Sequence, residues 1–236
     1  MKKINLVLVT LLLSGGCFAQ FGEFYSYRRF VETPPYSSEK VQKLLADSIP
    51  RFHYGHSGSL SAEIYAALSL RDKFAYNIAT GESFAQNCSM DMDPGHAEKL
   101  LFAQLAPPFG EYRWSDRQYK FFQSNRDSVI ALIKEYGIMA DHLGVNFKHV
   151  IVNLDATSLI PFLIGNYRLH PKDHDILTVL MLLMTQNHYS PFLKSPVYET
   201  LYGTRESSYR RTIALTTADQ DLIIRDANDF YHGLFK

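Results

Sequence analysis

The sequence predicts a mostly α-helical protein, a multi-helix bundle or a domain of stacked helical hairpins with little or no sheet. Three observations predict this fold class. Apolar residues recur at three- and four-residue intervals, Ser, Thr or Asp residues suited to helix N-termini precede these segments, and Gly or Pro residues follow them. Only residues 149–152, His-Val-Ile-Val, have the β-branched composition of a strand, so we expect at most one short strand there.

The first 19 residues have the layout of a secretory signal. Lys2 and Lys3 precede an uncharged apolar stretch at residues 6–13, and mostly small residues lead to Ala19. The apolar stretch is too short to cross a bilayer, which takes about 20 apolar residues. We therefore expect cleavage after Ala19, export to the periplasm or the medium, and no transmembrane segment in the mature chain.

The two cysteines bear on anchoring and on covalent cross-links. Cys17 follows Ser-Gly-Gly, but Leu13 lies four residues before it, whereas bacterial lipoprotein signals usually place Leu three residues before the lipidated cysteine. The sequence thus favours cleavage and leaves a lipid anchor at Cys17 as the alternative. Cleavage leaves Cys88 as the only cysteine, which excludes an intramolecular disulfide. We interpret Cys88 as a buried small apolar residue rather than a nucleophile.

Three regions follow from composition. After the signal, residues 20–36 are rich in aromatics and end near Pro34 and Pro35, which predicts an extended arm that lays its rings on the main body. Residues 37–236 are expected to form a single α-helical domain. Pro107 and Pro108 place any subdomain break near residues 106–112.

Helices in the first half of this domain are indicated by apolar periodicity and by local start and stop signals. Ser115 with Gln118 forms a capping box, Asn125 interrupts the following apolar stripe and predicts a kink or break, and Gly137 is a plausible C-terminal cap. Asp93 with a following Pro predicts a helix start. The expected helical segments are 37–49, 60–78, 93–105 and 115–136.

The second half contains the most apolar element of the chain. Residues 176–184, Ile-Leu-Thr-Val-Leu-Met-Leu-Leu-Met, are hydrophobic almost all round, which predicts a helix buried at the centre of the domain. We expect the helices at 119–136 and 222–230 to pack against it. Other predicted helices are 155–167, two short helices after Ser190 and Ser195, and a final helix capped by Thr217 with Gln220.

The stretch FHYGHSGS at residues 52–59 resembles part of a catalytic motif. Gly55, His56 and Ser57 match the first three positions of the nucleophile motif Gly-x-Ser-x-Gly, but Ser59 occupies the position of the last glycine. The motif also requires a preceding buried strand, where this sequence predicts a helix. We therefore interpret the stretch as a turn whose histidines bond loop carbonyls, with Ser59 or Ser61 capping the next helix.

A metal site was considered for the same histidines. Zinc takes three or four ligands, and His53 with His56 supplies two, so His170 and His174 would have to complete the set. Nothing in the sequence brings the two segments together, and we predict no metal and no cofactor.

Asp173, which stands before His174, is a weak candidate for acid–base catalysis together with Asp175. We instead expect both carboxylates to stabilise the positive end of the next helix.

Charge and motifs together limit the function. The chain has 24 Lys and Arg residues against 24 Asp and Glu residues and no long basic run, which excludes a nucleic-acid-binding surface. We expect an envelope or secreted protein that binds an unknown protein or envelope component without catalysis. The alternative is a hydrolase or metal-dependent enzyme centred on His53 and His56 with the segment 170–174.

Overall fold

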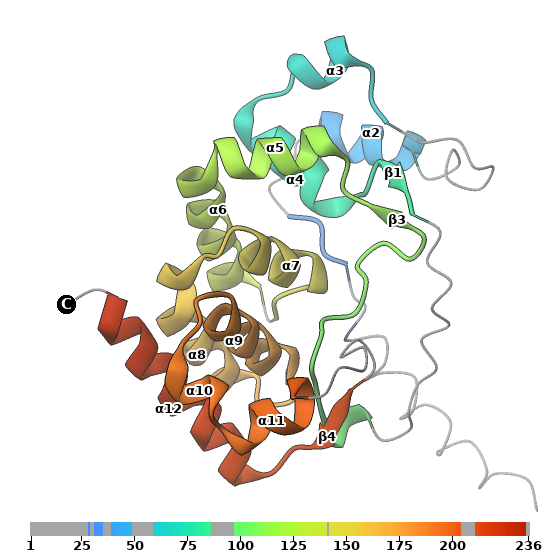
Figure 1. The fold of residues 1–236 in the computed structure, drawn as a ribbon. Helices are drawn as coiled ribbons and strands as arrows, with labels where there is room; N and C mark the ends of the chain where they lie inside the picture. Colours follow the sequence, from blue (N-terminus) through green and yellow to red (C-terminus); the bar gives the residue numbers. More distant parts are fainter. Residues whose placement is uncertain are drawn as a thin grey trace, which may run out of the picture.

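The computed structural model describes residues 28, 31–34, 39–48, 59–85, 97–140, 142–203 and 211–234. Within these residues the chain is mostly helical and has two small two-stranded antiparallel sheets, which confirms the predicted fold class (Figure 1). The signal segment with Cys17, the stretch 52–58 and Cys88 lie outside the described residues.

The helices follow one another through short connections over most of the chain. A 3-10 turn, Thr157–Leu159, leads directly into the eighth helix. The described α-helices are α2 (Glu39–Ser48), α3 (Ala62–Ala66), α4 (Leu70–Ala79), α5 (Asp116–Ser124), α6 (Arg126–Met139), α7 (Val145–Asn153), α8 (Ile160–Leu169), α9 (Asp175–Gln186), α10 (Ser190–Leu193), α11 (Pro196–Tyr202) and α12 (Thr217–Leu234).

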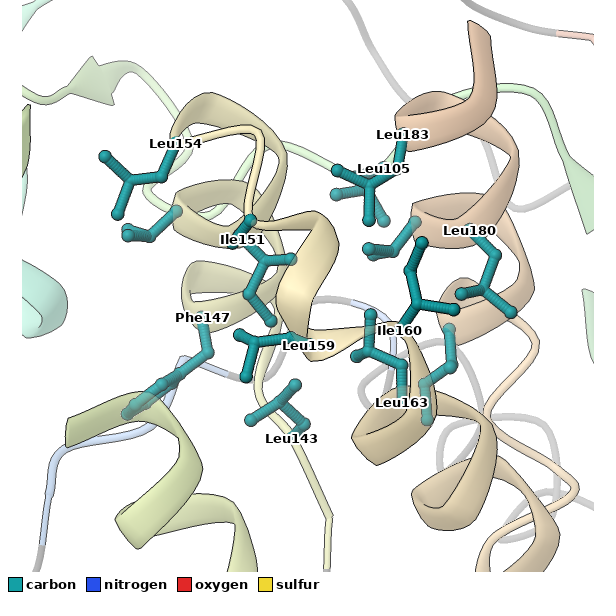
Figure 2. Close-up of a cluster of buried hydrophobic side chains, with 14 of the residues drawn as sticks. Leu105, Leu143, Phe147, Ile151, Leu154, Leu159, Ile160, Leu163, Leu180 and Leu183 are labelled. Atoms are coloured by element: carbon teal, nitrogen blue, oxygen red, sulfur yellow. The ribbon is translucent and has the colours of Figure 1, made fainter. Parts of the chain in front are cut away.

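Helix α9 lies at the centre of the main core, as predicted. Every residue from Asp175 to Met184 is buried except Leu182, which is partly buried. Its principal neighbours are α12, α7 and α8, and Figure 2 shows side chains of the shared core from α7, α8 and α9. The prediction for the final helix is confirmed. The segment 119–136 contributes to the same core but is not among the principal neighbours of α9.

Residues 149–152, the expected strand, are helical and belong to α7. Val150 and Ile151 are fully buried there, beside α9 and α4. A preference for β-strands reflects the fit of branched side chains to a packed surface, and a helix face buried on the core meets the same requirement. The packing of α7 therefore overrides the local preference.

Residues 97–105 are wrongly predicted as helix. After a 3-10 turn at Ala97–Lys99 they form β2 (Leu100–Phe102), which pairs with β4 (Thr212–Ala214). The opposite edge of β2 faces α9, where the Nδ1 of His174 bonds the Leu100 carbonyl at 3.0 Å and the Thr178 hydroxyl donates to the Phe102 carbonyl at 2.9 Å. The strand thus depends on partners far away in sequence. The second sheet pairs β1 (Ser83–Phe84) with β3 (Tyr112–Arg113).

The capping signals identify several helix ends correctly. The Ser115–Gln118 capping box begins α5, Asn125 separates α5 from α6, and Ser61 accepts a bond from the Ile64 amide at the start of α3. The final helix differs, because Thr216 forms a reciprocal cap with Asp219 in place of the predicted pair.

Gly137 does not end α6, which continues to Met139. A Cβ at Gly137 would lie 2.5 Å from the Cζ of Phe162, so this glycine allows α6 and α8 to approach each other. The prediction of a C-terminal cap is therefore wrong at this position.

The main core includes residues on both sides of 106–112. It contains Phe74, Leu105 and Trp114, and the indole Nε1 of Trp114 donates to the Asn77 carbonyl at 2.5 Å. A smaller cluster around Val41 and Tyr76 packs under α2 and α3. Among the described residues, no helix has the length and apolar character required to cross a membrane.

Truncation of the central helix tests its role. Leu180→Ala and Leu183→Ala should each lower the free energy of unfolding by about 2–5 kcal/mol, because each leaves a cavity at a fully buried position. Leu182→Ala, on the partly buried side of α9, is the matched control and should have a smaller effect. Urea denaturation followed by circular dichroism measures all three. Equal effects at the three positions would contradict the central placement of α9.

Candidate functional site

Arg28 and residues 31–34, which we call the strap, lie against the helical body near α7 (Figure 1, blue trace). The Arg28 Nε donates to both carboxylate oxygens of Asp175, at 3.0 and 3.1 Å, and its Nη2 donates to the Gln104 carbonyl at 3.1 Å. Its guanidinium carbon lies 3.3 Å from the centre of the Phe102 ring. Three different groups thus hold one end of the strap to α9 and β2.

The backbone of Glu32 is held by one amide side chain. The Oδ1 of Asn146, in the first turn of α7, accepts a hydrogen bond from the Glu32 amide at 3.2 Å, and its Nδ2 donates to the Glu32 carbonyl at 2.7 Å. The same Nδ2 donates to the Ile78 carbonyl at 2.7 Å, which ties the end of α4 to this point. Asn146 is fully buried, so these bonds satisfy a polar group that water does not reach.

The carboxylate of Glu32 is buried between two donors. The His142 Nε2 lies 2.8 Å from it, and the Tyr136 hydroxyl donates to it from α6. Gly144 makes room for this side chain, since a Cβ there would lie 2.9 Å from the Glu32 Cγ. Burial raises the pKa of Glu32, and the Tyr136 bond and the nearby His142 and Lys148 charges only partly oppose this effect.

A buried ion pair lies next to this carboxylate. The Lys148 Nζ is 2.6 Å from the Oδ1 of Asp173, and each side chain is 2% exposed. The Asp173 Oδ2 is buried and has no hydrogen-bond partner among the described residues. Burial raises the pKa of Asp173, with the neighbouring charge of Lys148 acting in the opposite direction. The two ion pairs and Glu32 lie close enough for their charges to influence one another, and we call them the buried cluster.

His149, beside Lys148 on α7, is also buried. Its Nε2 lies 2.8 Å from the Ala106 carbonyl and its ring contacts Trp114 edge-on. Burial lowers the pKa of this imidazole, which favours its neutral form. It bonds the backbone of the 106–112 connection rather than another ionisable group of the cluster.

The structure places only some of the candidate residues suggested by the sequence. Asp173 joins the buried cluster through Lys148, and the Nδ1 of His174 bonds the edge of β2. His170 is half-buried at the end of α8. His53, His56 and Ser57 lie outside the described residues. In the part of the chain that is described, no three His, Cys, Asp or Glu residues are grouped so as to hold a metal ion.

Several cluster residues carry no functional signal in the sequence. Lys148 stands directly before the β-branched stretch 149–152, and a lone lysine there suggests an exposed side chain. Glu32 and Asn146 are separated by more than a hundred residues. Gly144, two residues before Asn146, was the available signal, because a residue without a side chain near an amide permits close approach of another backbone.

A second polar cluster illustrates a purely structural arrangement. The buried Glu82 carboxylate accepts bonds from the hydroxyls of Tyr76 at 3.0 Å and Ser115 at 2.7 Å and from the Arg117 Nε at 2.8 Å. The Arg117 guanidinium also lies 4.3 Å from the centre of the Tyr65 ring. Because both carboxylate oxygens have donors, this cluster fastens the start of α5 to the end of α4. It presents no unpartnered carboxylate oxygen like that of Asp173.

Comparisons of the chain with models of known protein families, with curated proteins and with solved structures give no match.

Removing Lys148 alone should destabilise the fold, whereas replacing Lys148 and Asp173 together by apolar residues should not. Lys148→Met should lower the free energy of unfolding by about 3–5 kcal/mol, because it leaves the buried Asp173 without its cation. The double variant Lys148→Met/Asp173→Leu should recover most of this loss, since an apolar pair of similar volume needs no compensating charge. Urea denaturation at pH 7 provides the measurement.

The exposed Arg71–Glu135 pair is the control for this experiment. Its side chains are 46% and 43% exposed, so Arg71→Ala should change stability by less than about 1 kcal/mol. A Lys148→Met effect as small as the Arg71→Ala effect would contradict the buried pair.

The pH dependence of stability tests the burial of Glu32. Its pKa is raised in the folded state, so the folded protein binds this proton more tightly than the unfolded chain. Its contribution to stability therefore falls as pH rises from the ordinary glutamate pKa of about 4.3 through the raised value. Glu32→Gln should remove this dependence, and the variant should gain stability relative to the parent protein between about pH 4 and 7. Denaturation curves across that range measure the difference.

Glu135→Gln is the control, because its effect on stability should change with pH in the opposite direction. The pKa of Glu135 is lowered by its hydrogen bond with Arg71, so its stabilisation is present above the ordinary glutamate pKa and is lost as pH falls through the lowered value. This variant should lose stability relative to the parent protein as pH rises. Parallel curves for both variants would contradict the assignment for Glu32.

Proposed function

We propose that the protein is exported and binds a partner protein or an envelope component without catalysing a reaction on it. The observation that carries this proposal is the way in which the body holds the strap. Asn146 pairs with both backbone groups of Glu32. Asp175 holds the Arg28 side chain, and His142 and Tyr136 hold the Glu32 side chain. Backbone pairing together with side-chain recognition is how proteins bind extended peptide segments.

Export is supported by the first 19 residues. The basic residues, the short apolar stretch and the small residues before Gln20 follow the order of a secretory signal. The mature chain then begins at Gln20, close to the strap. A lipid anchor at Cys17 is the alternative form of the same export, and it would place the strap near a membrane surface.

A role in binding rather than catalysis is supported by the contacts of the charged groups. Lys148 is held by Asp173, Arg28 by Asp175, and Glu32 by His142 and Tyr136. A general acid or base has to reach a proton on its substrate. These side chains instead contact one another and the strap, so their charges serve recognition within the chain.

One experiment in cells tests export and binding together. The full chain is expressed with a photoreactive amino acid in place of Thr33, an exposed strap residue, and separately in place of Asp229, an exposed residue of α12. After fractionation and irradiation, the periplasmic or secreted protein should have the mass of a chain that begins at Gln20. The Thr33 position should give a specific adduct and Asp229 should give none. Mass spectrometry identifies the adduct, and the complex is then reconstituted from purified components.

The other outcomes distinguish the alternatives. A diacylglyceryl group on Cys17 would establish the lipoprotein form. Retention of the uncleaved chain in the cytoplasm would refute export, and equal adducts at both positions would refute a specific strap-side partner. Stoichiometric zinc in the purified mature protein, lost on changing His53 or His174 to Ala, would favour the metal-dependent enzyme.

A further inference from the structure

We propose that the surface beneath the strap is a recognition site for a peptide segment of a partner, in which an arginine is followed four residues later by a glutamate. We call this surface the strap site; it comprises Phe102, the Gln104 carbonyl, Tyr136, His142, Asn146 and Asp175. In the structure the strap occupies this site from within the same chain (Figure 1). The inference rests on the proposed binding function and names its ligand class.

The first position selects arginine. The Arg28 guanidinium uses its Nε and Nη2 on Asp175, its Nη2 also on the Gln104 carbonyl, and its flat face on the Phe102 ring. A lysine ammonium is a point charge without a flat face, so it cannot make the stacked contact together with the forked bonds. The Arg28 side chain is 10% exposed and that of Asp175 is 1% exposed, so little water competes for these contacts.

The second position, occupied by Glu32, binds both the backbone and the side-chain carboxylate of the residue there. Asn146 requires both an N–H and a carbonyl at the residue that it pairs with, which excludes proline there. His142 and Tyr136 then supply donors to a side-chain carboxylate at the same residue. Gly144 leaves the space that the Cβ and Cγ of this residue occupy. The second position is four residues after the first in the sequence, so the site selects the spacing of the two side chains as well as their chemistry.

The strap makes contacts that a second copy of its sequence can also make. Thr33 is exposed, Val31 is half-buried and Pro34 is buried, and the hydrogen bonds of Arg28 and Glu32 are the polar contacts of the strap with the body. A partner segment with the same two side chains can reproduce every one of these bonds. The strap competes as part of the same chain, where a short connection gives an effective concentration of roughly millimolar. Weakening the strap should therefore uncover the site for a peptide supplied separately.

Fluorescence anisotropy of a labelled peptide tests this exchange. The probe is Ser-Tyr-Arg-Arg-Phe-Val-Glu-Thr-Pro-Pro-Tyr, the sequence of residues 26–36. It is titrated with the mature parent protein and with the Glu32→Ala and Arg28→Ala variants, which alter the strap and leave the strap site intact. Each variant should bind the peptide at least about 10-fold more tightly than the parent protein does, because its own strap competes less well.

Altered peptides serve as matched controls that leave the protein unchanged. Replacing the peptide glutamate by Ala, replacing the arginine at the Arg28 position by Gln, and methylating the backbone nitrogen of the glutamate each remove one contact with His142, Asp175 or Asn146. Each change should weaken binding to the variants by at least about 10-fold, equivalent to about 1.4 kcal/mol. Equal binding of all four peptides would overturn the proposed specificity.

Folding of the variants is checked by circular dichroism melts. If either variant folds and no folded variant binds the peptide, the proposal is overturned. If neither variant folds, the strap is an integral part of the fold and the proposal is also overturned. These outcomes are independent of the experiment in cells: an adduct at Thr33 without peptide binding refutes only this ligand class. Peptide binding without export or an adduct refutes the cellular function instead.

Discussion

The burial of α9 on all sides is the constraint on which the rest of the structure depends. A helix without a polar face has to be covered all round, and here α7, α8 and α12 provide most of that cover. The requirement extends to the strand β2, whose free edge receives hydrogen bonds from His174 and Thr178. The short sheet therefore exists where α9 provides partners for carbonyls that would otherwise lack them.

The same arrangement brings charge into the interior. Asp173 and Asp175 stand at the start of α9, where the surrounding elements exclude water, and each is paired with a cation there. Lys148 comes from α7 and Arg28 from the strap. The body thus supplies one cation itself and takes the other from a segment far away in sequence. This division makes the strap a ligand of the helical body as well as a part of the chain.

The main helices and several of their ends could be predicted from the sequence because their signals are local. The capping box at Ser115, the break at Asn125 and the apolar stretch of α9 each lie within a few residues of the structure that they specify. Predictions were wrong where a distant partner decides the outcome. Residues 149–152 are helical because the core accepts α7, and 100–102 form a strand because β4 and α9 bond both edges.

The sequence by itself determined the helical fold class and the buried central helix, since periodicity and residue type carry this information without knowledge of contacts. Only the tertiary structure decided the candidate site. In the sequence alone, Glu32 looks like an acidic loop residue, Asn146 like an ordinary polar residue and Lys148 like a surface cation. They form a site because folding removes water from around them, so their polar groups must be paired with other groups of the protein. Those partners come from distant segments and are present only in the folded chain.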